Sequence, residues 1–126
     1  MFGSDIIRIK VKGYLRNITD NEIFEFEERG IKNKDKITFN NDIKYSIRCN
    51  DNEIMMIRDG NDFVNTFIFN NNNSKSNYLL KENGYDMDME VNVSNMKSND
   101  KLIYIEYEIV STSCKYEFKI EMSEML

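Results

Sequence analysis

The sequence contains no histidine, tryptophan, proline, glutamine or alanine, and only two of its 126 residues are cysteine. Without histidine, the chain lacks the usual general base near neutral pH and the commonest protein ligand for metals. Two cysteines alone cannot complete a standard zinc site. No nucleophile stands beside a base, and no glycine-rich phosphate loop is present. We therefore expect no enzymatic activity, no cofactor and no bound metal.

Basic charge and long apolar runs are also scarce. The formal net charge is −5 and the pI is near 4.8. Nucleic-acid binding requires a basic footprint that displaces counterions, so we expect no nucleic-acid partner. No apolar run approaches the roughly 18 residues of a membrane span, and residues 1–12 do not have the pattern of a signal peptide. The expectation is a single cytoplasmic domain over residues 1–126 without membrane contact.

The two cysteines, Cys49 and Cys114, fall on the apolar faces of separate predicted strands. Two buried thiols in a reducing compartment are the simplest interpretation. A disulfide or a redox pair is the alternative.

What the chain does contain is a strict alternation of apolar and polar residues. The C-terminal third shows it three times, over Tyr85–Ser94, Leu102–Val110 and Ser113–Met122. A period of two places successive side chains on opposite faces of a β-strand. Shorter segments predict further strands at Asp5–Lys12, Glu22–Arg29, Lys36–Phe39, Ile43–Cys49, Glu53–Arg58, Asp62–Phe69 and Tyr78–Lys81. Gly13 is expected to end or bend the first of them.

These strands predict an all-β protein, because no helical period persists beyond two turns. Each strand has a single apolar face, which suits an antiparallel meander closed into a barrel of about eight to ten strands. A two-sheet sandwich fits the same pattern and is the alternative. The Asn- and Ser-rich run 70–77 is expected to be a mobile loop.

The last predicted hairpin allows two registers that keep both apolar faces together. One places Tyr107 opposite Tyr116 and Glu108 opposite Lys115, and the other places Tyr107 opposite Phe118. A three-residue slip would turn one apolar set to solvent.

Several short motifs resemble those of a known family. They are a basic first strand ending in Val11–Gly13, the segment Ile54-x-Met56-x-Arg58-x-Gly60, a Phe-rich strand and the segment Tyr78–Gly84. Over nearly its whole length the chain resembles DUF1934, a family of YwiB-like uncharacterised bacterial proteins. The resemblance implies a lipocalin-like, or calycin-like, antiparallel barrel without an assigned activity. Arg58, Gly60 and Gly84 match glycine and arginine positions of the family, whereas Tyr78–Gly84 lacks the Thr and Pro of its motif and is one residue longer.

Arg58 is the most informative single residue. The alternation Ile54, Met56, Arg58 directs its guanidinium toward the interior or its rim. A charged group there needs partners, because an unpaired buried charge is very costly. Either Arg58 bonds to a carboxylate or to turn carbonyls as a structural element, or it anchors the carboxylate or phosphate of a ligand.

Methionine and tyrosine side chains share the predicted inner faces. Because methionine adapts its shape, such a lining suits a flexible apolar ligand, although it equally suits a filled core. The candidate ligand-binding residues are Arg58, Met56, Met87, Met89, Tyr107 and Tyr116.

Acidic residues alternate along one predicted strand, at Asp86, Asp88 and Glu90. A solvated outer face explains them better than a cation site, because one strand spaces them too widely for an oxygen cage. Residues 59–62 are interpreted as a turn.

Two functions follow from these patterns. The first is a barrel that binds a small apolar or anionic molecule. The second is a protein-interaction or structural module with a filled core, in which the Asp86 strand or the Glu106 and Glu108 face meets a partner. A homodimer is an open alternative for its assembly.

Overall fold

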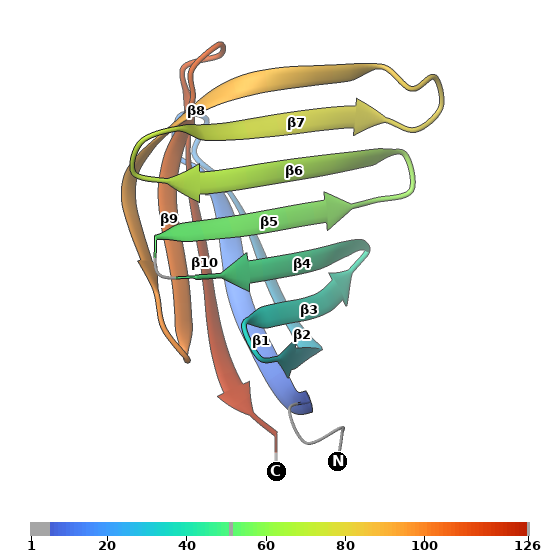
Figure 1. Ribbon diagram of the computed structural model, residues 1–126, viewed down its shortest axis with the longest axis vertical. Helices are drawn as coiled ribbons and strands as arrows, with labels where there is room; N and C mark the ends of the chain where they lie inside the picture. The colour runs from blue at the N-terminus through green and yellow to red at the C-terminus, as the bar shows by residue number, and fades with distance from the viewer. Residues whose placement is uncertain (1–5, 51, 126) are drawn as a thin grey trace.

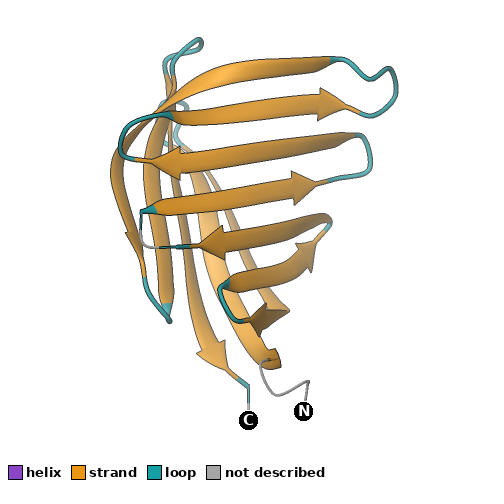
Figure 2. Cartoon of the chain, in the orientation of Figure 1, coloured by secondary structure: helices purple, strands orange, loops and turns teal. Residues whose placement is uncertain are grey.

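In the computed structural model, which describes residues 6–50 and 52–125, the chain forms ten strands joined by turns (Figure 2), and Asp5 of the first predicted strand lies outside the described residues. The strands are β1 (Ile6–Asn17), β2 (Glu22–Asn33), β3 (Lys36–Asn41), β4 (Ile43–Cys49), β5 (Glu53–Asp59), β6 (Phe63–Asn70), β7 (Ser74–Leu80), β8 (Asp86–Ser98), β9 (Leu102–Ile109) and β10 (Cys114–Glu124).

Each strand pairs antiparallel with the next along the chain, and β10 pairs with β1 to close the barrel. In Figure 1, β3 to β7 are stacked across the front, while β1, β2, β9 and β10 run behind them in a different direction. The prediction of a single antiparallel meander closed into a lipocalin-like barrel is therefore confirmed. The sandwich alternative is wrong, because the strand order runs continuously around one closed sheet.

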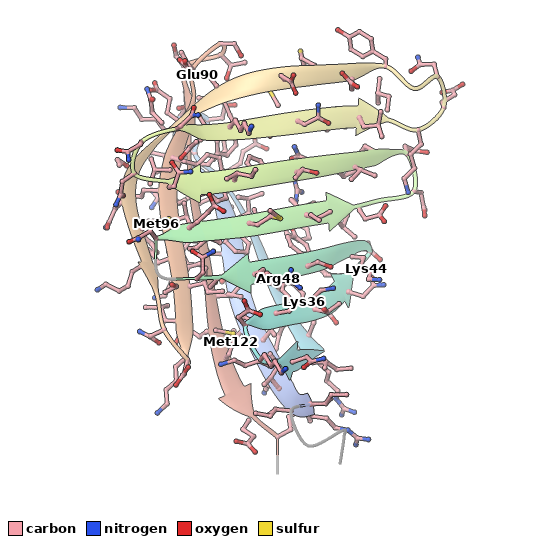
Figure 3. All side chains as sticks on the ribbon, viewed as in Figure 1. Lys36, Lys44, Arg48, Glu90, Met96 and Met122 are labelled. Carbon is pink, nitrogen blue, oxygen red and sulfur yellow. The ribbon has the colours of Figure 1, made fainter. Side chains whose placement is uncertain are left out.

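Apolar side chains fill the middle of the barrel. The ring of Phe39 stacks on that of Tyr45 at 4.7 Å, and Phe67 stacks on Phe69 at 5.1 Å. Aliphatic side chains from the other strands are buried beside these rings, among them Val11, Ile47, Ile54, Ile103, Ile105 and Ile120. The outer side of β3 and β4 carries Lys36, Lys44 and Arg48 (Figure 3), as the alternation predicts.

The last hairpin adopts the first of the two predicted registers. Tyr107 lies opposite Tyr116, and Glu108 lies opposite Lys115. Tyr107 and Phe118 are both buried on the inner face, as this interpretation of the core requires.

The predicted mobile loop over residues 70–77 is wrong in its second half. Residues from Ser74 onward belong to β7, and Ser74 and Ser76 are buried. The Ser74 hydroxyl accepts from the Asn70 N–H and donates to the Asn70 carbonyl, both at 2.8 Å. The inward positions of this strand hold hydrogen-bonded serines instead of apolar residues, so the alternation of apolar and polar residues did not reveal it.

Gly13 does not end β1, which continues to Asn17. A Cβ atom at this position would overlap the carbonyl oxygen of Lys119 on β10. The glycine therefore permits the close approach of the two strands that close the barrel.

Candidate functional site

Alternate turns of an antiparallel meander lie at the same end of the barrel. The turns at residues 18–21, 42, 60–62, 81–85 and 110–113 border one end, which we call the Arg58 end. Arg58 is the next-to-last residue of β5, immediately before one of these turns. The position of the candidate site thus follows from strand order.

The alternation along β5 directs Arg58 inward, as predicted. Ile54 and Met56, on the same face, are buried in the core, whereas Arg58 at the rim is half-buried. Its direct cross-strand neighbours are Tyr45 on β4 and Asn65 on β6. Three inward-facing polar groups therefore stand side by side across β4, β5 and β6.

Within the described part of the chain, two hydrogen bonds hold the Arg58 guanidinium, and both acceptors are neutral. Its Nε donates to Tyr45 Oη at 3.3 Å, and one terminal nitrogen donates to Asn65 Oδ1 at 3.4 Å. The guanidinium carbon also lies 5.6 Å from the centre of the Tyr45 ring and 5.9 Å from that of Phe63. Among the ion pairs of the described residues, none includes Arg58. No carboxylate of residues 6–50 and 52–125 therefore forms the ion pair expected of a structural arginine.

Asn65 is buried and held in a fixed orientation. Its Nδ2 donates to Ser76 Oγ and to the carbonyl of Asn77, each at 3.0 Å. Because both amide hydrogens are used on β7, the amide oxygen is left to face Arg58. β6 and β7 together thus fix the acceptor that positions the guanidinium.

Tyr107 and Tyr116 extend the polar surroundings from β9 and β10. Their rings stack with centroids 5.3 Å apart, and Tyr107 is buried while Tyr116 is half-buried. Burial raises the pKa of the Tyr107 hydroxyl, and the positive charge of Arg58 opposes part of that rise. Burial likewise raises the pKa of Tyr116. Both phenols therefore stay neutral near pH 7 and leave the charge of Arg58 uncompensated.

Apolar side chains at the Arg58 end face inward yet remain accessible. Met87 is 44% exposed and Phe24 is 55% exposed, although both lie on the inner faces of their strands. Met89 is half-buried, and Phe63 stacks on Tyr78 with a centroid distance of 5.4 Å. The barrel is filled in its middle but leaves an accessible apolar rim around Arg58.

The predicted site residues are thus divided between core and rim. Arg58, Met87, Met89, Tyr107 and Tyr116 come from strand ends that border the Arg58 end, whereas Met56 is fully buried beneath it. Sequence reasoning missed Tyr45, Asn65 and Ser76. A signal for Asn65 was present, because it is the one polar residue on the inner face between Phe63, Phe67 and Phe69.

Two glycines, Gly60 and Gly84, lie in turns beside this end. Gly60 is buried, and a Cβ there would lie 2.7 Å from the Phe63 ring, so the glycine leaves room for that ring. Gly84 has φ of +71°, a left-handed conformation that favours glycine.

The acidic residues of β8 lie on the outer face, as predicted, with Asp86, Asp88 and Glu90 exposed. Within the described residues, no three His, Cys, Asp or Glu side chains gather closely enough to hold a metal ion. Both cysteines are free thiols and half-buried rather than fully buried, Cys49 as the last residue of β4 and Cys114 as the first residue of β10 at the opposite, Arg58 end. Burial raises the pKa of the Cys49 thiol.

The other predicted acidic face carries a polar network outside the barrel. Glu106 and Glu117 lie directly opposite each other on β9 and β10, and the Tyr104 hydroxyl contacts both carboxylates. Tyr14 donates a hydrogen bond of 3.1 Å to Glu117, and Arg16 lies 3.8 Å from the same oxygen. Residues of this face, including Glu106, Glu108 and Lys115, also line a surface hollow.

Fold and site together define a small closed antiparallel β-barrel with an inward arginine at one end. Comparison with solved structures finds a similar chain, the YwiB protein from Bacillus subtilis, whose crystal structure gives a TM-score of 0.69 at 14% sequence identity over 100% of both chains. This similarity shows the fold. No family model matches the chain, and no curated protein matches it. In residues 6–50 and 52–125, no helix suited to span a membrane is found.

Proposed function

We propose that the protein binds a small organic anion with an apolar portion at the Arg58 end of the barrel. The observation that supports this proposal is the set of partners around the Arg58 guanidinium. It faces the inner side of the barrel with two neutral acceptors at 3.3 and 3.4 Å and no carboxylate at ion-pairing distance in the described part of the chain.

A guanidinium has five N–H donors arranged in a planar fork that matches the two oxygens of a carboxylate or phosphate. Tyr45 and Asn65 use two of these donors. The remaining donors and the full positive charge are then available to an anion. The neutral neighbours Tyr45, Asn65 and Tyr116 do not compete with that anion for charge, and their dipoles orient the fork.

The accessible rim supplies contacts for the apolar portion. Phe63 and Tyr78 present stacked rings next to the guanidinium, and Met87 and Met89 lie on the adjacent strand β8. Methionine side chains adapt to irregular apolar shapes, so this rim favours a flexible chain over a rigid ring system. The filled middle of the barrel limits such a ligand to the rim rather than the centre.

We also propose that the chain is a member of the DUF1934 family and that it is a binding protein rather than an enzyme. Arg58, Gly60 and Gly84 support the family assignment, together with the YwiB-like fold. A reducing cytoplasm as its location agrees with two free thiols on separate strands.

The test is a set of melting curves for wild type, Arg58→Ala and Arg58→Lys, with and without fatty acids and phosphorylated metabolites. A ligand that binds only the folded state raises the melting temperature with its concentration. We expect at least one anion to stabilise the wild type, Arg58→Ala to lose that response, and Arg58→Lys to keep part of it. Arg48→Ala is the matched control, because Arg48 lies on the outer face of the adjacent strand and pairs with Asp35 at 3.8 Å.

Native mass spectrometry of freshly purified protein should show a co-purifying anion that is absent from Arg58→Ala. A large loss of stability in Arg58→Ala, with no anion response in either protein, would make Arg58 structural and remove the proposal.

A further inference from the structure

The strand β2 is fully paired along only one of its edges. β1 pairs with all of β2 from Glu22 to Asn33, whereas β3 pairs only with Gly30 to Asn33. Figure 1 shows β3 beside only the lower end of β2. No backbone group or side chain of the described residues bonds to the other edge of residues 22–28. The closed barrel therefore carries a short open strand edge near its Arg58 end.

The backbone groups on this edge can be assigned from the hairpin between β2 and β3. A two-residue turn, Lys34–Asp35, makes Asn33 and Lys36 a pair that exchanges both hydrogen bonds. Every second residue back along β2 then points its N–H and C=O to the same side. Ile23, Glu25 and Glu27 therefore direct their backbone groups to the open edge, and their side chains are exposed on the outer face.

The charge on this edge disfavours pairing with a second copy of the chain and favours pairing with a basic strand. Residues 22–28 contain four glutamates, at Glu22, Glu25, Glu27 and Glu28. Two-fold pairing with a second copy about Glu25, Phe26 or Glu27 would set glutamates directly opposite each other, which is destabilising. A strand carrying lysine or arginine would instead meet opposite charge.

The chain itself shows the kind of strand that β2 accepts. On the paired edge, β1 alternates Arg8, Lys10 and Lys12 with Ile9 and Val11, and Lys12 lies directly opposite Glu27. Lys10 Nζ is 3.1 Å from the Glu27 carboxylate. The open edge offers the same glutamates to a second such strand, together with Ile23 and Phe24, which are 58% and 55% exposed.

We propose that residues 22–28 of β2 receive an extended segment of a partner protein as an added strand, in which lysine or arginine alternates with apolar residues. In the added strand, the basic residues lie directly opposite Glu25 and Glu27 and form backbone hydrogen bonds with them. Their side chains lie on the outer face beside the two carboxylates. The alternate apolar residues turn inward toward Phe24 and Phe26. Strand addition of this kind takes affinity from the main chain and specificity from alternate side chains.

The probe is a capped, fluorescent peptide with the sequence of residues 6–13, Ile-Ile-Arg-Ile-Lys-Val-Lys-Gly, measured by anisotropy with the full chain. We expect binding that weakens with added salt. Replacing its three basic residues by glutamate should weaken binding by at least about tenfold. N-methylation of the three basic residues should do the same, because it removes the hydrogen bonds to the edge. N-methylation of the two apolar residues between them should preserve binding, because the backbone N–H groups of those two residues point away from the β2 edge.

Two variants test whether the peptide binds at the open edge of β2. Glu25→Pro removes an N–H that the barrel does not use, whereas Glu25→Thr removes the same charge and keeps the N–H. We expect Glu25→Pro to bind at least about tenfold more weakly than Glu25→Thr. In amide hydrogen exchange, the peptide should protect Ile23, Glu25 and Glu27.

Three results would overturn the proposal. The first is no measurable binding of the peptide, and the second is binding whose affinity is unchanged by both Glu25→Pro and N-methylation. The third is a dimer, detected by sedimentation, that Glu25→Pro dissociates. The last would make a second copy of the chain the occupant of the edge.

Discussion

Arg58 and Asn65 lie directly opposite each other on β5 and β6, and the guanidinium donates to Asn65 Oδ1 over 3.4 Å. Asn65 is in turn held by Ser76 and by the carbonyl of Asn77 on β7. The position of the inward arginine at the barrel end thus depends on a buried amide of β6 that is hydrogen-bonded to both neighbouring strands, β5 and β7.

Replacement of Asn65 by alanine should therefore destabilise the protein. It leaves the buried Ser76 hydroxyl and the Asn77 carbonyl without their donor, which costs about 1 to 3 kcal/mol in free energy of unfolding. Urea denaturation of Asn65→Ala measures this, with Asn61→Ala in an exposed turn as the control. An unchanged denaturation midpoint would contradict the assigned role of Asn65. Asn65→Asp should in addition abolish the anion response, because it gives Arg58 an internal counter-charge.

Tyr104 should make stability depend on pH in the alkaline range. Burial raises the pKa of its hydroxyl, and hydrogen bonds to Glu117 and Glu106 raise it further. In the unfolded chain the hydroxyl loses its proton near pH 10, whereas in the folded protein it keeps it. Folding stability from this group is therefore fully present below about pH 10 and falls as the pH rises above it.

Denaturation of wild type and Tyr104→Phe between pH 8 and 11 isolates this contribution. The stability difference between the two proteins should shrink as the pH rises, since phenylalanine has no proton to lose. At neutral pH, Tyr104→Phe should be the less stable protein, because Glu106 and Glu117 then face each other without the hydroxyl between them. A constant difference across the range would show that Tyr104 does not titrate in this way.

Gly13 should tolerate no side chain, because the Lys119 carbonyl occupies the space of a Cβ. Gly13→Ala must push β1 and β10 apart where the barrel closes, and a loss of about 1 to 3 kcal/mol is expected. Gly84→Ala provides the contrast, since nothing lies within 4 Å of its Cβ and only the φ of +71° is strained. Gly84→Asn should recover stability and Gly13→Asn should not, because asparagine tolerates the left-handed region. Equal thermal melts for all four variants would refute this explanation of Gly13.

Much of the fold was predictable because the relevant signal is local. A period of two is imposed by the pleat of a single strand, so it correctly placed Arg58, Met56 and Tyr107 on inner faces. It failed where polar residues face inward. Ser74 and Ser76 are buried in β7, and their alternation with Lys75 and Asn77 carries no contrast between apolar and polar residues.

The sequence by itself determined the class of fold, the face on which each predicted strand residue lies and the absence of histidine chemistry. Only the tertiary structure decided which residues stand opposite one another. Tyr107 faces Tyr116 rather than Phe118, Arg58 lies between Tyr45 and Asn65, and β3 pairs with β2 only at Gly30–Asn33. The physical reason is that the face to which a side chain points is set within one strand. Register and barrel closure instead depend on strands far apart in the chain that must fit around one shared core.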